Sequence, residues 1–490
     1  MEFFLFLKQI SLILYFIIVA TTMVVVVMEN RQPMKTVAWL LVLSFLPVLG
    51  IILYFIFGQN IRKERHINKH SLDPFTRQSM LEYSEQKNLQ LPEEHEQLIQ
   101  LFTNQNLALP FVNNDVEFYT SGRQFFPVLL AAIREAKHHI HLTTYIIDND
   151  PLGNEFADAL IAKAQEGVEV RLIYDDVGCW RTRSKFFKRM QKGGVEVCGF
   201  LPVYFPALTS KINYRNHRKI CIIDGRTGFI GGMNIAQRYI DGTGTQPWRD
   251  THLRVQGGCV NALQRTFLED WYFVCNKLIA DPKYYDANLT LKEDEETDIP
   301  TPGIGRGEAL AQVVTSSPTA QWHNIMQGYV RILLQARKYV YMETPYFLPT
   351  EPVVFAMRTA ALSGVDVRLM LPFHGDSKIV EWASRSFLPE IIKAGVKVYL
   401  YKAGFLHSKL LISDDTVCTC GSTNIDFRSF ENNFEANIFF YDKEVTRRMK
   451  RIFLDDLRHC VLANEVERKH RTPFLDRFVQ SVFRLFSPLL

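Results

Sequence analysis

The chain of 490 residues is too long for one ordinary domain, and its hydrophobic content of 47% is enough for several cores and for membrane segments. Its formal net charge of +4 fits contact with an anionic surface but does not distinguish lipid from nucleic acid. The eight cysteines include no Cys-x-x-Cys pair, which argues against a zinc site or a disulfide framework and favours reduced thiols in the cores.

Two apolar segments near the N-terminus predict membrane-spanning helices. Residues 10–28 and residues 37–57 carry no charged side chain, and each is close to the ~20 residues that a helix needs to cross a bilayer. The turn between them is short, so we expect an antiparallel hairpin within residues 1–60. Basic residues are denser after the second segment than in the turn, which predicts a multi-pass membrane protein whose larger part faces the cytoplasm.

An internal repeat organises the rest of the chain. A polar, helical connector at residues 61–110 is followed by two copies of the same motif order, at residues 111–290 and residues 309–445. An acidic and then Pro- and Gly-rich stretch at residues 291–308 is the expected linker between the copies. Each copy alternates helices with continuous apolar runs such as VEVRLIY and VDVRLML, which predicts an α/β fold.

Residues 446–490 are predicted to form a helical tail. Near its end, apolar residues fall on one helical face: Leu475, Phe478, Val479, Val482, Leu485, Phe486 and Leu489. Such a helix could lie flat in the membrane interface or pack on the protein, and the sequence leaves both readings open.

Each copy carries the pattern His-x-Lys-x4-Asp, as HRKICIID and HSKLLISD. The residues are His217, Lys219 and Asp224 in the first copy and His407, Lys409 and Asp414 in the second. Alternate side chains of a strand share a face, so each imidazole should lie beside its lysine. The aspartate stands an odd seven positions after the histidine, which predicts a structural or ion-pairing residue facing away from the imidazole.

The spacing after the pattern strengthens a functional reading. A Gly-small-x-Asn tetrad ending in Asn234 or Asn424 follows at the same distance in both copies. Histidine, lysine and asparagine among small residues are suited to a tetrahedral anion such as phosphate. Two such halves facing each other would hold one phosphate between two imidazoles, of which one attacks phosphorus while the other protonates the leaving alkoxide. Opposite protonation states of the pair predict bell-shaped activity in pH.

The paired signature resembles the phospholipase D superfamily. The apolar N-terminal segments, together with TPYFLP, PWRDTHLRVQG and GSTNIDFRSFENNFE, resemble the bacterial cardiolipin synthases over essentially the whole chain. The resemblance implies two phospholipase D-like repeats, each a mixed β-sheet flanked by helices, packed with pseudo-two-fold symmetry. It also implies a bacterial inner-membrane enzyme that works on phosphatidylglycerol and anionic lipid, with no cofactor, no metal and no nucleic acid. One phosphatidylglycerol would transfer its phosphatidyl group to another through a phosphohistidine, with release of glycerol.

The resemblance also assigns roles to residues. It places the six signature residues in the catalytic set, with His217 as nucleophile and His407 as acid and then base. The lysines, Asn234, Asn424 and Ser422 are implied to hold phosphoryl oxygens, and Asp250 and Glu435 to orient the histidines. The first copy has Gly232 where much of the superfamily has serine, so a hydroxyl contact to phosphate is not expected from that half.

Two further segments are candidates for lipid access. A basic run interleaved with apolar residues spans residues 181–192, and it suits either anionic headgroups or a solvated helix face. The loop at residues 199–210 is unusually apolar, and its Tyr204, Phe205 and Leu208 are expected to touch acyl chains or to pack on the second copy. Alternatives that the sequence leaves open are a phospholipase D-type hydrolase, another phosphatidyltransferase and a non-catalytic lipid-binding membrane protein.

Overall fold

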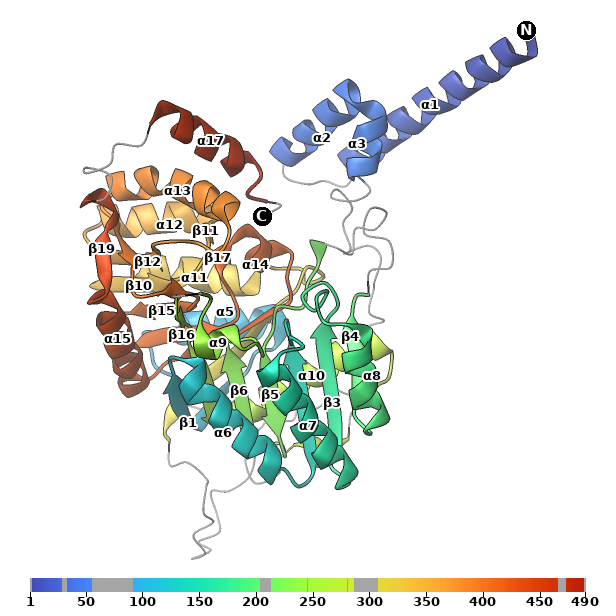
Figure 1. Ribbon diagram of the computed structural model, residues 1–490. Coiled ribbons are helices and arrows are strands. Elements are labelled where there is room, and N and C mark those ends of the chain that lie inside the picture. Colours follow the sequence, from blue (N-terminus) through green and yellow to red (C-terminus); the bar gives the residue numbers. More distant parts are fainter. Residues whose placement is uncertain are drawn as a thin grey trace, which may run out of the picture. The chain divides into compact units, whose positions relative to one another are not determined.

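The computed structural model describes residues 2–28, 33–54, 91–202, 213–244, 246–279, 281–285, 307–465 and 473–488 (Figure 1). The chain forms two compact units: residues 1–65 with residues 202–214, and residues 66–201 with residues 215–490. Most of the predicted connector, the linker and the predicted lipid contacts Tyr204, Phe205 and Leu208 lie outside the described residues.

The N-terminal unit contains the helices α1 (Glu2–Met28), α2 (Pro33–Phe45) and α3 (Pro47–Leu53). The first predicted span falls on a continuous apolar helix, Gln9–Met28, which is long enough to cross a membrane. The second predicted span is not one straight helix in its described part, since α2 ends at Phe45 and a new helix begins at Pro47, where the ring cannot continue the helical hydrogen bonds. Gly50 then allows α3 to approach α2 closely, because an added Cβ would lie 3.0 Å from the Val42 carbonyl oxygen.

The larger unit is built on one 15-stranded sheet with the order β19-β13-β12-β10-β15-β16-β18-β9-β1-β8-β6-β5-β2-β3-β4. The first half contributes β1 (Pro110–Tyr119), β2 (His139–Thr144), β3 (Glu169–Asp175), β4 (Glu196–Phe200), β5 (Ile220–Ile223), β6 (Thr227–Gly231) and β8 (His252–Gln256). The second half contributes β9 (Ala309–Ser316), β10 (Tyr339–Glu343), β12 (Asp366–Pro372), β13 (Lys397–Tyr401), β15 (Leu410–Ser413), β16 (Val417–Gly421), β18 (Glu435–Phe440) and β19 (Cys460–Leu462).

The strand order has pseudo-two-fold symmetry about the pair β1 and β9. These two strands are antiparallel neighbours, and the order β8-β6-β5-β2-β3-β4 on one side is matched by β18-β16-β15-β10-β12-β13 on the other. In each half three strands are parallel and the others antiparallel. The predicted α/β fold with two mixed-sheet repeats is therefore confirmed.

Helices cover both faces of each half of the sheet. In the first half, α6 (Gly122–Glu135), α7 (Pro151–Gln165) and α8 (Ser184–Lys192) share one core, and α10 (Cys259–Cys275) lies on the other face. In the second half, α5 (Glu96–Asn106), α11 (Asn324–Gln335), α12 (Glu351–Leu362) and α13 (Lys378–Lys393) share the core, and α15 (Lys443–Leu457) lies opposite (Figure 1). Short elements complete the unit: β7 (Trp248–Arg249), α9 (Arg238–Asp241), β11 (Phe347–Leu348), β14 (Phe405–Leu406), β17 (Ile425–Asp426), α14 (Phe427–Glu431), a 3-10 turn (Pro282–Tyr284) and α17 (Phe474–Leu485).

Most of the basic run falls on α8, whose apolar side chains Phe186, Phe187 and Met190 are buried in the first core. One sequence expectation needs correction in this unit. Cys198 on β4 and the last residue of α10, Cys275, are joined by a disulfide, although reduced cysteines were expected. The spacing of 77 residues hides this pair from the sequence, because β4 and the end of α10 meet only in the folded unit.

Candidate active site

The two His-x-Lys segments are held by the opposite repeat. The backbone N–H of His217 donates to the Phe434 carbonyl at 2.9 Å, and the N–H of His407 donates to the Arg249 carbonyl at 2.7 Å. The segments β14 and β7 also pair in parallel across the two repeats. These bonds place His217 beside Glu435, the residue after Phe434. They place His407 beside Asp250, the residue after Arg249.

Each imidazole meets one carboxylate from the other repeat. His217 Nδ1 lies 3.0 Å from Glu435 Oε1 and 3.1 Å from Oε2, and His407 Nδ1 lies 2.6 Å from Asp250 Oδ2. Both carboxylate side chains are 0% exposed. A carboxylate acceptor fixes the proton on Nδ1, so the lone pair of a neutral imidazole is left on Nε2.

The lysines of the signature share this buried site. Lys219 Nζ donates to the His217 carbonyl at 2.6 Å, and Lys409 Nζ donates to the His407 carbonyl and lies 3.0 Å from His407 Nδ1. Burial lowers the pKa of His217 to about 4 and that of His407 to about 3, and the charge of Lys409 contributes in both cases. Burial also lowers the pKa of Lys219 to about 7, with a further contribution from Lys409. The charge of each lysine therefore lowers the pKa of both imidazoles, including the imidazole of the other repeat.

The carboxylates remain ionised in this site. Burial raises the pKa of Asp250, but the charge of Lys409 and the bond from His407 outweigh it and the pKa is lowered. The pKa of Glu435 is lowered in the same way, against burial, by His217 and Lys219. The site accordingly sets two anionic carboxylates beside two lysines and two imidazoles, and burial lowers the pKa of both imidazoles.

The small residues after the signature serve these carboxylates. Ser422 Oγ donates to Glu435 Oε2 at 2.5 Å, so this serine orients the acid behind His217. At the matching place in the first repeat, a Cβ on Gly232 would lie 2.1 Å from Asp250 Oδ1. The glycine therefore makes room for the carboxylate of Asp250.

The two asparagines differ in their surroundings. Asn234 Oδ1 accepts from the Ile146 N–H at 3.2 Å, and its Nδ2 donates to the Tyr239 hydroxyl at 2.9 Å. Asn424 is buried, and its Oδ1 has no hydrogen-bond partner among the described residues. Asn234 thus positions Tyr239, while the Asn424 side chain hydrogen-bonds the Asp426 carboxylate.

The signature aspartates do not join the imidazoles. Asp224 accepts from the backbone N–H groups of Lys137, His138 and His139 at 2.8 to 3.0 Å, at the start of β2. Asp414 accepts in the same way from residues 337–339 at the start of β10. Both aspartates thus hold the backbone at the start of a neighbouring strand, as the parity argument predicts for structural residues.

Aromatic residues around the histidines were missed by the sequence reasoning. The Tyr145 ring lies 4.9 Å from that of His217, and the Tyr346 ring 6.2 Å from that of His407. The Tyr239 hydroxyl lies 3.4 Å from His407 Nδ1. The internal repeat could have identified two of them, because Tyr145 in TTYII and Tyr346 in TPYF follow corresponding strands. No such correspondence in the repeat indicated Tyr239.

Comparison with known proteins decides the family. Residues 129–257 and residues 329–457 match the domain described as "Cardiolipin synthase, PLD-like domain", and residues 11–59 match "Phospholipase_D-nuclease N-terminal". The chain is 39% identical over 475 residues to cardiolipin synthase 2 of Bacillus anthracis, covering 95% of this chain and 89% of that protein. The chain belongs to the cardiolipin synthase family of phospholipase D-like proteins.

Other cardiolipin synthases are similarly close. The protein of Alkalihalophilus pseudofirmus is 38% identical, covering 95% of this chain and 91% of that one, and the protein of Clostridium perfringens is 37% identical, covering 94% and 95%. The crystal structure of a phosphatidylserine synthase from Haemophilus influenzae Rd KW20 superimposes with a TM-score of 0.60 at 16% identity, over 81% of this chain and 100% of that one. That likeness shows a shared fold.

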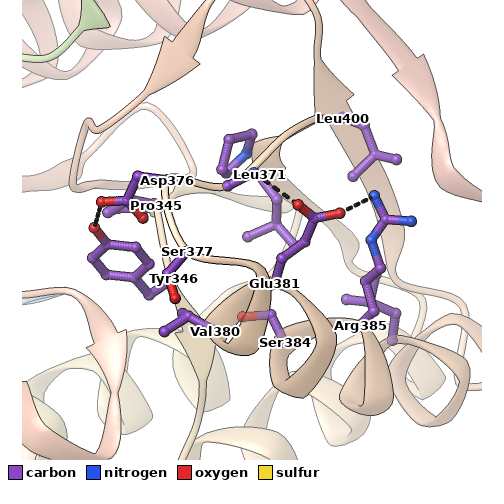
Figure 2. Close-up of a pocket in the computed structure, with 13 residues that line it drawn as sticks. Pro345, Tyr346, Leu371, Asp376, Ser377, Val380, Glu381, Ser384, Arg385 and Leu400 are labelled. Carbon is purple, nitrogen blue, oxygen red and sulfur yellow. Dashed lines mark hydrogen bonds and ion pairs between the residues drawn. The ribbon is translucent and has the colours of Figure 1, made fainter. Parts of the chain in front are cut away.

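This member of the cardiolipin synthase family has a pocket in its second repeat, one wall of which is Tyr346, a neighbour of His407 (Figure 2). It has an empty volume of about 380 Å³ and lies between the ends of β10 and β12 and the start of α13. Tyr346 forms part of its wall and donates from its hydroxyl to Asp376 Oδ2 at 2.7 Å. In the described part of the chain, no three His, Cys, Asp or Glu residues are arranged to hold a metal ion.

Proposed function

We propose that the chain makes cardiolipin by moving a phosphatidyl group from one phosphatidylglycerol to another, with release of glycerol. The observation that carries the proposal is the buried pair of imidazoles, each backed by a carboxylate of the opposite repeat and flanked by a lysine. Two imidazoles of one site can act on opposite sides of a single phosphorus atom.

In the first step, His217 Nε2 attacks the phosphorus of the donor lipid. The new N–P bond forms as the bond between phosphorus and the glycerol oxygen breaks, and His407 supplies the proton that this oxygen needs. Glu435 stabilises the positive charge that develops on His217. Both imidazoles are neutral at pH 7 in the structure, so the proton on His407 depends on the bound phosphodiester, whose negative charge favours the imidazolium.

In the second step, the terminal hydroxyl of another phosphatidylglycerol attacks the phosphohistidine. His407, now neutral, takes the hydroxyl proton, the new O–P bond forms and the N–P bond breaks. Lys219, Lys409 and Asn424 neutralise and position the phosphoryl oxygens in both steps. One phosphodiester replaces another, so no nucleotide is consumed.

The test uses purified protein with phosphatidylglycerol vesicles in the presence of chelator. Cardiolipin and glycerol should appear in equal amounts, and a peptide that carries a phosphatidyl group on His217 should be trapped by acid-free quenching and mass spectrometry. His217→Ala and His407→Ala should both abolish cardiolipin formation. A wild-type enzyme that yields phosphatidic acid in place of cardiolipin would instead identify a hydrolase, and a phosphopeptide containing His407 would reverse the two roles.

The membrane arrangement is also a proposal. Family membership and the apolar helix Gln9–Met28 support attachment to a bacterial membrane. We propose two spans with the catalytic unit in the cytoplasm, as the basic residues after the second segment favour. A disulfide between Cys198 and Cys275 would not persist in a reducing compartment, so both thiols should react with a maleimide in lysed, unreduced cells. Protection of both thiols until a reductant is added would place the unit outside.

We further propose that α17 lies in the membrane interface. One face of the helix packs on α13, where Arg484 pairs with Glu390 at 3.2 Å and Phe483 contacts Trp382. The other face exposes a row of large apolar side chains: Phe474, Leu475, Phe478, Leu485 and Phe486. The helix is therefore docked on the protein, and the apolar stripe that the other described residues leave exposed supports the interfacial reading as well. Replacing Leu475, Phe478 and Leu485 by serine should lower activity on vesicles far more than activity in detergent micelles, and equal losses would reject the assignment.

A further inference from the structure

The pocket beside Tyr346 differs in charge from the site that holds the phosphate. Its lining contains two carboxylates, Asp376 and Glu381, and one guanidinium, Arg385. The guanidinium is already engaged, since Arg385 pairs with Glu381 at 2.6 Å and donates to the Phe373 carbonyl at 3.2 Å. A surplus of carboxylate repels a lipid phosphate, but it attracts hydroxyl groups that can donate hydrogen bonds.

The remaining polar atoms of the pocket also suit a small alcohol. Glu381 Oε2 accepts from the Gly375 N–H, and Ser384 Oγ accepts from the Phe347 N–H, which leaves the serine hydroxyl able to donate into the pocket (Figure 2). The apolar part of the lining includes Leu371, Val380, Leu388 and Leu400. Apolar walls with a few polar groups are typical of small-molecule sites.

Position relative to the histidines identifies the ligand. Tyr346 is both a wall of the pocket and a neighbour of His407, with ring centroids 6.2 Å apart. In an in-line displacement by His217, the leaving glycerol of the first step and the attacking hydroxyl of the second both lie on the side of phosphorus opposite His217. That side belongs to His407, so one pocket next to this imidazole can serve the alcohol in both steps.

We infer that the pocket is the alcohol subsite of the reaction, and that it binds the neutral glycerol headgroup of the lipid through Asp376, Ser377 and Ser384. The inference rests on the proposed phosphatidyl transfer. It explains why the enzyme would prefer a polyol as acceptor. Ser384 is buried, and a buried group that hydrogen-bonds a substrate hydroxyl discriminates against an analogue that lacks this hydroxyl.

The test compares two soluble acceptors in the full-length enzyme with phosphatidylglycerol vesicles. Labelled glycerol measures exchange into phosphatidylglycerol, and propan-1-ol, which lacks the second and third hydroxyl groups, measures formation of phosphatidylpropanol. Asp376→Asn removes a carboxylate, and Ser377→Leu fills the pocket with a bulkier side chain. Each should lower the ratio of glycerol transfer to propanol transfer by roughly tenfold or more, as expected for loss of a hydrogen bond to a charged group.

Lys378→Leu is the matched control, because Lys378 is the exposed neighbour of Ser377 and does not line the pocket. Its ratio should equal that of the wild type. An unchanged ratio in both Asp376→Asn and Ser377→Leu would overturn the assignment, whether or not total transfer falls. A wild-type enzyme that transfers to neither alcohol would instead overturn the proposed phosphatidyl transfer, and the alcohol subsite with it.

Discussion

Replacing Glu435 by glutamine isolates the contribution of one carboxylate to the chemistry. Glutamine keeps the length of the side chain and can still accept from His217 and bond to Ser422, so the fold should be retained. The charge behind the imidazole is lost. An exposed carboxylate would contribute only ~0.2–1 kcal/mol, which is less than tenfold in rate.

The burial of Glu435 makes the expected effect much larger. Its side chain is 0% exposed and contacts His217 Nδ1 at 3.0 and 3.1 Å, so no solvent compensates for the lost charge when the imidazole becomes cationic. Loss of the acid in a comparable buried acid–imidazole pair lowers turnover by about 10⁴-fold, or about 5.5 kcal/mol at 1.36 kcal/mol for each tenfold. We therefore expect turnover to fall by roughly 10³- to 10⁴-fold.

The assay is the initial rate of cardiolipin formation from phosphatidylglycerol vesicles, with the thermal midpoint as a check on folding. Glu444→Gln removes a carboxylate that is 68% exposed and pairs with Arg451, and it should stay within twofold of the wild type. Ser422→Ala should lie between the two, because it removes one of the bonds that orient Glu435. A Glu435→Gln enzyme with more than a third of the wild-type rate would refute the role of Glu435 as the carboxylate that stabilises the cationic form of His217.

Three further outcomes follow from the same site. First, kcat/KM should be bell-shaped in pH: it should rise as His217, with its pKa lowered to about 4, loses its proton and becomes nucleophilic, and it should fall as Lys219 loses its charge near its pKa of about 7; a rate independent of pH from 4 to 9 would contradict this. Second, Gly232→Ala should lower the cardiolipin rate at least tenfold and also lower the thermal midpoint, because the new Cβ displaces buried Asp250 from His407; wild-type activity would show that the acid tolerates the shift. Third, excess EDTA should leave the rate of the purified enzyme unchanged, and loss of activity that magnesium restores would show a metal requirement.

The fold was predictable because the chain repeats itself. Two copies of the same order of apolar runs fix the layering, and the period of two along a strand places His217 beside Lys219 and turns Asp224 away. The break in the second N-terminal segment was also visible, since Pro47 lies in the middle of the predicted span. Local patterns thus carried most of the architecture.

The carboxylate that pairs with each imidazole was not predictable from local sequence patterns. Glu435 is 218 positions from His217, and Asp250 is 157 positions from His407, so neither pairing has a sequence period. The pairing depends on how β18 and β8 align beside β9 and β1, which is a property of the docked repeats. Resemblance to a family named the two acids, but only the folded chain shows that each serves the opposite repeat.

The first repeat has Gly232 where the second has Ser422, and the physical reason is the different acid that each of them contacts. Gly232 and Ser422 occupy matching places, since their backbone N–H groups donate to the Thr251 carbonyl at 2.9 Å and to the Ala436 carbonyl at 3.0 Å. Glutamate is one methylene longer than aspartate, and beside Glu435 there is space for a serine that donates to the carboxylate. Asp250 holds its carboxylate where that serine side chain would stand, and it is bonded instead by the Thr251 N–H at 2.7 Å. Glycine with aspartate and serine with glutamate are therefore two ways to fill one volume, and a change to either member requires a change in the opposite side chain if the imidazole is to keep its anionic partner.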